Sequence, residues 1–322
     1  MLQHLQGKKI LVIGDIMIDD YIWGSVSRIS PEAPVPVVEV KAEELRLGGA
    51  ANVAANVRSL GGWAILVGAV GDDALAERLT EDLLKHGIDG GGIIVDKGRP
   101  TTVKTRVIAG SQQIVRFDRE SFEDVKGEGL SRIQGAIEEK LGQVDGLIIS
   151  DYGKGVITEA LLHWLIPQAL QRKKTISVDP KENHFPLYRG VTVITPNHRE
   201  AGIAVGKAIR TEEDLNNVGL DLLSKIGVNS VLITRGAQGM RLFERGKPPV
   251  QIDTVAREVY DVVGAGDTVV GALTLSLAAG ASMEEAARIS NYAAGVVVGK
   301  KGTATVTLEE LENSLEADRR EG

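Results

Sequence analysis

The segment Asp261–Thr268 combines residue types whose spacing fits a chemical reaction. Gly264 and Gly266 precede a long apolar stretch typical of a buried helix, whose first-turn N–H groups are unpaired. With Ala265 these glycines could form an anion hole, aided by the helix dipole. Asp267 lies in the same turn and could accept a proton from an attacking hydroxyl. The pattern fits phosphoryl transfer, and it fits equally well glycines that pack a helix and an aspartate that caps it.

Two other segments have residues suited to ligand binding. Gly48 and Gly49 precede a predicted helix over residues 50–60, where Asn52 could hydrogen-bond sugar hydroxyls. Tight helix packing explains the same glycines. Asn197 and Glu200 would share one helical face and could organise water and Mg²⁺ around nucleotide phosphates. Taken alone, this pair is better explained as a helix N-cap and its capping box.

Length, composition and charge limit the classes of function. The chain has 322 residues, of which 43% are hydrophobic and 25% charged, as in an ordinary globular protein. Its formal net charge of −7 disfavours nucleic acid as a partner. The absence of cysteine excludes disulfides and thiolate metal sites. No signal peptide begins the sequence, and the apolar stretch 262–281, which contains Asp267, is interpreted as a core helix rather than a membrane span. We therefore expect a cytoplasmic protein without a membrane partner.

Short apolar runs alternate with helical stretches along most of the chain. The predicted strands are Lys9–Ile13, Ala64–Val70, Gly146–Ser150, Thr175–Val178, Val191–Thr195 and Ser230–Thr234. This order predicts an α/β fold with a mostly parallel central sheet between helices. Ligands bind such sheets at the carboxyl ends of the strands, where Asp15, Asp151, Asp179 and Asn197 lie.

Two segments interrupt this alternation. Residues 22–40 contain Pro31, Pro34 and Pro36, so we expect an extended segment that is not a central strand. Residues 101–118 alternate in polarity around a turn at Gly110-Ser111, which predicts a hairpin. We interpret the two segments as a small antiparallel β lid on a single domain spanning residues 1–322. Two surface loops are the alternative.

Four of these motifs occur in a recognisable order. The segments Gly48–Asn52, Asn197–Glu200, Thr234–Gly239 and Gly264–Asp267 together resemble the ribokinase-like sugar kinases, also called the phosphofructokinase B family, over residues 8–311. By contrast, neither a P-loop nor a dinucleotide-binding glycine motif is present.

A narrower resemblance depends on other segments. Gly14–Asp19, Arg28–Val38, Ser150–Gly155 and Val178–Lys181 are similar to the kinase part of D-glycero-β-D-manno-heptose-7-phosphate kinases. In that family the kinase is often fused to a nucleotidyltransferase. Because this sequence ends at Gly322, soon after the kinase part, the resemblance does not predict the second activity.

The resemblance implies roles for individual residues. Asp267 would be the catalytic base, with Gly264, Ala265 and Gly266 as the anion hole. The residues implied to bind ATP are Asn197, His198, Arg199, Glu200, Thr234, Arg235, Gly236, Gly239 and Asn291. Those implied to hold the sugar are Asp15, Asp19, Gly48, Gly49 and Asn52. The family also implies Mg²⁺ near Glu200 (through water), a monovalent cation near the C-terminal loops, and a homodimer formed through the lid.

The substrate expectation depends on cations near the predicted lid and strand ends. A phosphorylated sugar needs cations near its phosphate, arginine above all. The candidates are Arg28, Lys104, Arg106, Arg116, Lys154 and Lys181, of which we favour Arg106 and Lys181; solvated surface charge is the alternative. The expected reaction is ATP-dependent phosphorylation of the heptose 7-phosphate on its anomeric hydroxyl. Fructokinase, ribokinase and nucleoside kinase remain alternatives, as does a non-catalytic sugar sensor.

Overall fold

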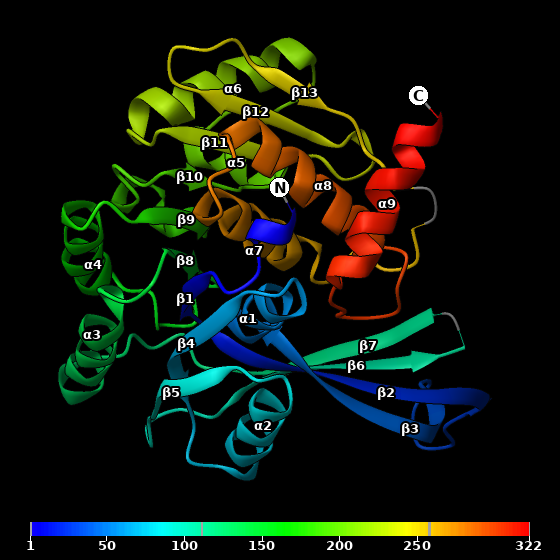
Figure 1. Ribbon diagram of the computed structural model, residues 1–322. Helices are drawn as coiled ribbons and strands as arrows, with labels where there is room; N and C mark the ends of the chain where they lie inside the picture. Colours follow the sequence, from blue (N-terminus) through cyan, green and yellow to red (C-terminus); the bar gives the residue numbers. More distant parts are fainter. Residues whose placement is uncertain (1, 111, 257–258, 322) are drawn as a thin grey trace.

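The main body of the protein is one large sheet covered by helices on both faces (Figure 1). The computed structural model describes residues 2–110, 112–256 and 259–321. Within these residues the sheet has nine strands, in the order β13-β12-β11-β10-β9-β8-β1-β4-β5. It is parallel from β5 to β11, and β12 and β13 are antiparallel. The strands are β1 (Lys9–Gly14), β4 (Trp63–Val70), β5 (Asp89–Val95), β8 (Gly146–Ser150), β9 (Thr175–Asp179), β10 (Val193–Ile194), β11 (Ser230–Thr234), β12 (Met240–Glu244) and β13 (Val250–Ile252).

All six strands predicted from the sequence are present, although β10 is shorter than expected. The prediction missed β5, β12 and β13. Strand β5 begins Asp89-Gly90-Gly91-Gly92, and glycine weakens a strand because it has no side chain to pack. Its backbone is nevertheless bonded to β4, so tertiary pairing overrides this low propensity.

Eight helices cover the two faces, within the described residues. Helices α1 (Ala50–Ser59), α2 (Ala74–Lys85), α7 (Ala265–Ala278) and α8 (Met283–Val297) pack on one face, and α9 (Leu308–Glu321) packs on α8. Helices α3 (Gly127–Leu141), α4 (Glu159–Gln171), α5 (His198–Val205) and α6 (Glu212–Lys225) cover the other face. Short 3₁₀ helices span Leu2–His4, Glu182–Leu187 and Gly236–Gln238.

Strand β1 shows how the sequence produces two cores. Leu11 and Ile13 point to the face covered by α3–α6, whereas Ile10 and Val12 point to the other face. Side chains of a strand alternate between faces, so a fully buried parallel strand must be apolar at every position. This explains why the central strands read as continuous apolar runs.

The predicted core helix is also confirmed. Helix α7 lies inside the stretch 262–281, and its residues from Asp267 to Ser276 are buried. In the described part of the chain, no helix is long and apolar enough to span a membrane.

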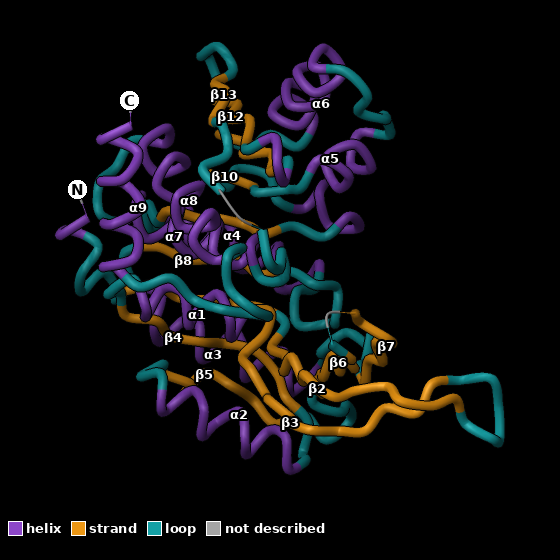
Figure 2. Tube along the Cα trace, turned by 90° about the vertical axis from the view of Figure 1, so that its right-hand side faces the viewer, coloured by secondary structure: helices purple, strands orange, loops and turns teal. Residues whose placement is uncertain are grey.

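A second sheet of four strands projects from the body (Figure 2). Its order is β3 (Pro36–Gly49), β2 (Ile16–Ile29), β6 (Thr102–Ala109) and β7 (Gln112–Arg119). Each predicted segment is a hairpin, and β2 and β6 join the two hairpins as parallel neighbours. Ser111, in the second predicted turn, lies outside the described residues.

The proline argument was wrong for part of the first segment. Strand β2 lies inside the four-stranded sheet and pairs on both sides as far as Gly24, so residues 22–24 belong to a central strand; residues 25–29 pair with β3 alone. Pro31 and Pro34 lie in the turn between strands, and Pro36 begins the edge strand β3. Proline is tolerated at these places because no ladder hydrogen bond needs its missing N–H. The lid is therefore larger than predicted, and β3 runs directly into α1.

The strand order reverses beside β1. This strand pairs with β4 on one side and β8 on the other, so connections leave its carboxyl end in opposite directions. A crevice opens at such a switch point and is the usual ligand site of an α/β sheet. Asp15 follows β1 and Asp151 follows β8, at this reversal.

Gly14 controls how closely β1 and β8 approach at that point. A Cβ at this position would lie 2.1 Å from the carbonyl oxygen of Ser150. We expect Gly14→Ala to lower the free energy of unfolding by roughly 1–3 kcal/mol, the usual cost of overpacking, measured by urea denaturation. Gly135→Ala on the exposed side of α3 is the control: its Cβ meets nothing within 4 Å, so stability should be unchanged or higher.

Candidate active site

Asp267 is a buried carboxylate with a hydrogen-bond donor on each oxygen. The Asn52 side-chain amide donates to Oδ2 at 2.8 Å, and the Tyr152 hydroxyl donates to Oδ1 at 2.7 Å. Burial raises the pKa of Asp267 to about 7, although both donors lower it. A carboxylate with such a pKa is suited to accept a proton near neutral pH.

The backbone before Asp267 leaves donors free. Gly264 adopts a φ of 80° as the N-cap of α7, where a Cβ would lie 2.8 Å from Nδ2 of Asn52. The N–H of Ala265 donates to Val262 at 3.3 Å. Among the described residues, the N–H groups of Gly266 and Asp267 have no acceptor. Part of the predicted anion hole is therefore available to a ligand.

A short network fixes the amide of Asn52. Asn56 donates to Oδ1 of Asn52 at 3.3 Å, and Thr268 donates to Oδ1 of Asn56 at 3.1 Å. Because Oδ1 of Asn52 is an acceptor in this chain, its Nδ2 faces Asp267 as a donor. The sequence predicted Asn52 as a sugar ligand; its contact with the Asp267 carboxylate was not foreseen.

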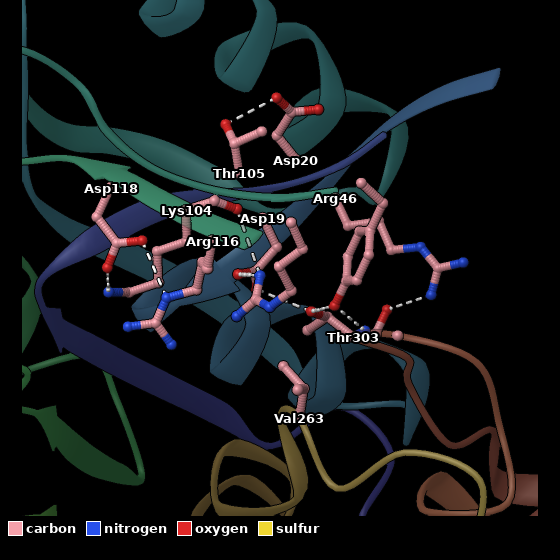
Figure 3. Close-up of polar contacts among 12 residues, drawn as sticks. Asp19, Asp20, Arg46, Lys104, Thr105, Arg116, Asp118, Val263 and Thr303 are labelled. Carbon is pink, nitrogen blue, oxygen red and sulfur yellow. Dashed lines mark hydrogen bonds and ion pairs between the residues drawn. The ribbon is translucent and has the colours of Figure 1, made fainter. Parts of the chain in front are cut away.

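Asp19, on the lid strand β2, is close enough to Asp267 to raise the pKa of that carboxylate. Figure 3 shows Asp19 with its partners in the lid and the C-terminal loop. Its Oδ1 accepts from Nη1 of Arg106 at 2.5 Å, and its Oδ2 accepts from Thr303 at 2.8 Å. Thr303 also donates its N–H to the hydroxyl of Tyr21 at 3.0 Å. The buried pair of Asp19 and Arg106 thus joins β2, β6 and the C-terminal loop.

Gly48 and Gly49 lie where backbone must approach these carboxylates. A Cβ on Gly48 would lie 2.7 Å from Oδ2 of Asp19. Gly49 has a φ of 52°, and its Cβ would lie 2.6 Å from the carbonyl oxygen of Asp15. Close packing therefore accounts for Gly48, and close packing with a positive φ accounts for Gly49. The neighbours are Asp19 and Asp15 rather than the helix contacts that the sequence left open as the alternative.

Three of the other candidate cations, Lys104, Lys154 and Arg116, are paired with acids. Lys104 contacts both Asp118 and Glu120, and Lys154 contacts Glu120 at 2.6 Å. Arg116 contacts Asp118 at 3.1 Å (Figure 3), and Arg28 is exposed on β2.

The carboxylate of Asp15 accepts hydrogen bonds from backbone N–H groups of the loop after β8. Its Oδ2 accepts the N–H groups of Tyr152 at 2.8 Å and Lys154 at 3.0 Å, and its Oδ1 accepts that of Val156 at 3.0 Å. Burial raises the pKa of Asp15 to about 6. Asp15 is thus bonded to the loop after β8, and the sugar contact expected from the sequence stays a prediction.

Two further carboxylates continue this cluster toward the next strands. Asp151 accepts from Nδ1 of His184 at 2.6 Å and from the Tyr188 hydroxyl at 2.6 Å. The bond to Asp151 raises the pKa of His184. Asp179 faces the turn of Gly266, whose Cβ would lie 3.9 Å from its Oδ2. Burial, with Asp267 and Glu200 nearby, raises the pKa of Asp179.

Asn197 and Glu200 form a capping box at the start of α5. Oδ1 of Asn197 accepts the N–H groups of Arg199 and Glu200 at 3.0 Å, and Oε2 of Glu200 accepts the N–H of Asn197 at 2.9 Å. The structural alternative is therefore present. It still leaves Glu200 near Asp179 and Lys181, and burial raises the pKa of Glu200.

The other predicted nucleotide residues surround this end of the sheet. Thr234 forms a parallel bridge with Asn197, and the side chain of Asn291 donates to the Asp253 carbonyl at 2.8 Å. Gly239 has a φ of 73°, and its Cβ would lie 2.1 Å from the carbonyl oxygen of Ile252. Gly236 also has positive φ, at 57°.

His198 and Arg199 are exposed at the start of α5 and line a surface pocket with Ile203 and Lys207. Arg235 turns to Gln238 and Gln251. In the described part of the chain, none of these three side chains bonds to the carboxylates described above.

The structure thus brings Asp267, Asn52, Asp19 and Arg106 together, with Asp179 between this group and Glu200. Sequence reasoning gave no role to Tyr152, Thr303 or Tyr21. Tyr152 had a signal, because it lies in the Ser150–Gly155 segment that carries the family resemblance. Thr303 and Tyr21 had none.

The sequence matches the pfkB family of carbohydrate kinases over residues 7–311. The chain belongs to this family and is a carbohydrate kinase. It is 46% identical over 319 residues to the bifunctional protein HldE of Geobacter sulfurreducens, covering 99% of this chain and 65% of that relative. It is 44% identical over 303 residues to HldE of Helicobacter hepaticus, covering 94% and 63%. The chain spans less than two thirds of these relatives.

Solved structures share the fold. Phosphofructokinase-2 from Escherichia coli in complex with substrates and products has a TM-score of 0.77 and 20% identity, covering 97% of this chain and 99% of that one. Arabidopsis thaliana ribokinase complexed with ribose and ATP has a TM-score of 0.76 and 19% identity, with the same coverage. The predicted ribokinase-like fold, with its second small sheet, is confirmed.

The raised pKa of Asp267 has a cost in stability. Between pH 3.8 and about 7 the folded state binds more protons than the unfolded state, so this group destabilises the fold as pH rises through that window. We expect Asp267→Asn, which cannot ionise, to be more stable than the wild type at pH 8, by up to about 4 kcal/mol. The difference should disappear near pH 4. Urea denaturation at both pH values measures it, and a constant difference would contradict the raised pKa.

Proposed function

We propose that the protein transfers the γ-phosphoryl group of ATP to the anomeric hydroxyl of D-glycero-β-D-manno-heptose 7-phosphate, giving the 1,7-bisphosphate, a step in ADP-heptose synthesis for lipopolysaccharide. The observation that carries this proposal is the buried Asp267 carboxylate in the first turn of α7, held by two donors beside unpaired backbone N–H groups. The similarity to the HldE proteins supports the choice of sugar.

In this proposal Asp267 accepts the proton of the anomeric hydroxyl while the oxygen of that hydroxyl bonds to the γ-phosphorus of ATP. The bond to the β–γ bridging oxygen breaks, and ADP leaves. The free N–H groups of Gly266 and Asp267 stabilise the charge on the transferred phosphoryl oxygens. General-base catalysis of this kind typically contributes ~10²–10⁴ in rate.

The nucleotide side fits ATP with Mg²⁺. Mg²⁺ takes one or two protein carboxylates and fills its other positions with phosphate and water. Among the described residues no group of three or more His, Cys, Asp or Glu could hold a metal alone, and Glu200, through water, with Asp179 nearby is the donor set we propose. When bound, Mg²⁺ would offset the negative charge of the phosphates. Asn197, Thr234, Gly236, Gly239 and Asn291 would line the ATP site.

The sugar side combines carboxylate, amide and guanidinium groups. Asp19 and Asn52 would bind hydroxyls, and Gly48 and Gly49 would let the sugar approach the backbone. Within the described residues, only Nη1 of Arg106 is used in hydrogen bonds, so its other nitrogens can bind the 7-phosphate. Lys181 contacts Glu182 at 3.4 Å and lies near Glu200, so it would act at the border of the sugar and nucleotide sides.

We also propose that residues 1–322 act as one cytoplasmic kinase unit that forms a homodimer through the four-stranded lid. Edge strands need a partner or a cover. The lid exposes apolar side chains at Val26, Ile29, Val35, Val40, Val115 and Phe117. Such side chains on both hairpins are suited to a second copy of the same sheet.

A substrate panel tests the proposed function. We expect ADP release with the heptose 7-phosphate, and little with fructose, ribose or nucleosides. Asp267→Asn should lose about 10²–10⁴ in kcat, which excludes a contaminating kinase. Preferred use of an unphosphorylated sugar would instead favour a fructokinase, ribokinase or nucleoside kinase, and no turnover of any sugar would favour a sugar sensor.

Arg106 tests recognition of the distal phosphate. We expect Arg106→Ala to raise the KM for the heptose 7-phosphate at least tenfold, because a charge-assisted contact is lost, with a smaller effect on the same heptose without phosphate. Arg28→Ala, an exposed lid cation, is the control and should change neither value. Equal losses on both sugars would show that Arg106 acts only by holding Asp19.

A further inference from the structure

We infer that Asp15 and Tyr152 are positioning residues for Asp267: Asp15 fixes the loop after β8, and the Tyr152 hydroxyl on that loop orients the carboxylate that receives the proton. This inference depends on the proposed role of Asp267 as the base. It gives Asp15 a different role from the sugar contact predicted from the sequence.

The first step is that Asp15 has little capacity left for a ligand. Three backbone N–H groups of the loop point at its carboxylate, at 2.8–3.0 Å. The residue is only 1% exposed. A buried carboxylate is stable only when donors replace its lost hydration, and this loop supplies them. Asp15 therefore determines the path of residues 152–156.

The second step is that the loop is held from its other side as well. Nη1 of Arg99 donates to the Lys154 carbonyl at 2.8 Å, and the N–H of Val125 donates to the Gly155 carbonyl at 2.8 Å. Gly155 has a φ of 86°, and a Cβ there would lie 2.0 Å from the Glu123 carbonyl oxygen. The loop can therefore place the side chain of Tyr152 in one position.

The third step is that both donors to Asp267 depend on Asp15. Its carboxylate holds the loop that carries Tyr152. Its carbonyl oxygen accepts the N–H of Ala50 at 3.1 Å, at the start of the helix that carries Asn52. Asp15 is thus a common anchor for the two hydrogen bonds that orient Asp267.

Several charged groups face Asp267 from other elements. Asp19 approaches from β2 and Asp179 from the end of β9, and both are acidic. Loss of a proton from Asp267 is therefore opposed by its neighbours, and the donors Tyr152 and Asn52 offset this. The pKa of Tyr152 is itself raised well above 10, mainly by burial, so the hydroxyl remains a donor at all working pH values.

Tyr152→Phe removes one hydroxyl and leaves the ring to pack. Because the lost donor favours the charged carboxylate, the pKa of Asp267 should rise by about one pH unit. Titration of the ¹³C-labelled aspartate carboxyl groups by NMR, assigned with Asp267→Asn, measures this without any substrate. The control is Tyr292→Phe, which breaks a similar tyrosine–carboxylate bond, to Asp318 on α9. This variant should leave the titration of Asp267 unchanged. An unchanged titration in Tyr152→Phe overturns the inference.

The kinase assay provides the second readout. With the heptose 7-phosphate, the acidic limb of kcat/KM should lie near pH 7 in the wild type and move to higher pH in Tyr152→Phe, by the amount seen in the titration. At pH 6.5 this corresponds to a loss of several-fold, with the KM for ATP unchanged. A uniform loss at all pH values would indicate a merely structural role and overturn the inference.

Asp15→Asn tests the anchor. We expect a lower kcat and the same displacement of the acidic limb, with little additional effect in the Tyr152→Phe background because both changes act through one bond. A raised KM for the sugar with unchanged kcat would make Asp15 a sugar ligand and overturn its assigned role. If Asp15→Asn does not fold, Arg99→Gln is the substitute, because it loosens the same loop from its other side. It should move the acidic limb of the pH profile in the same direction. An unmoved acidic limb would overturn the role of Asp15 as the anchor of this loop.

The two arms separate failure of the inference from failure of the proposed function. If the wild type phosphorylates no sugar, the proposed function fails, while the titration still decides whether Tyr152 controls Asp267. If the sugar is phosphorylated but neither the titration nor the pH profile responds to Tyr152→Phe, the kinase stands and the inference falls.

Discussion

One buried charge determines much of this molecule: the carboxylate of Asp267 at the start of α7. Removing a carboxylate from water costs several kcal/mol unless donors replace its hydration. Here the donors replace only part of that hydration. Tyr152 and Asn52 bind one carboxylate oxygen each, and burial still raises the pKa of Asp267 to about 7. The charged Asp267 therefore destabilises the fold relative to a neutral side chain at this position. A carboxylate kept at such a cost fits the proposed role in proton transfer.

The sheet makes this arrangement possible. The strand order reverses at β1, and at such a reversal the connections leave neighbouring strands in opposite directions, which is where ligands usually bind an α/β sheet. Asp15 and Asp151 follow these two strands, and helices α1 and α7 begin at the same edge. Residues separated by more than 200 positions, such as Asn52 and Asp267, are thereby brought within hydrogen-bond distance.

Much of the fold could be predicted from the sequence, since apolar runs and capping residues are local signals. The site was predicted less completely. Asp267 and Asn52 were identified because glycines mark the starts of their helices. The bonds of Asp15 to the loop after β8 could not be predicted from the sequence. A carboxylate at the end of a strand has the same local sequence whether it binds a ligand or a neighbouring loop. For Glu200 the sequence offered two interpretations, a ligand of the nucleotide site and part of a capping box with Asn197, and the capping box is present.

Hydrogen bonds connect the lid to the turn before α7, a connection that only the tertiary structure reveals. Asp261 accepts the N–H of Val263 just before the anion hole and the N–H of Gly302 in the C-terminal loop. The next residue, Thr303, is bonded to Asp19 and Tyr21 on the lid strand β2. These bonds join Asp19, through Thr303 and Gly302, to the turn that begins α7. Sequence spacing carries no sign of this connection. Apart from the local bond between Val263 and Asp261, each contact joins residues more than 40 positions apart, and such hydrogen bonds form only when the packed elements meet.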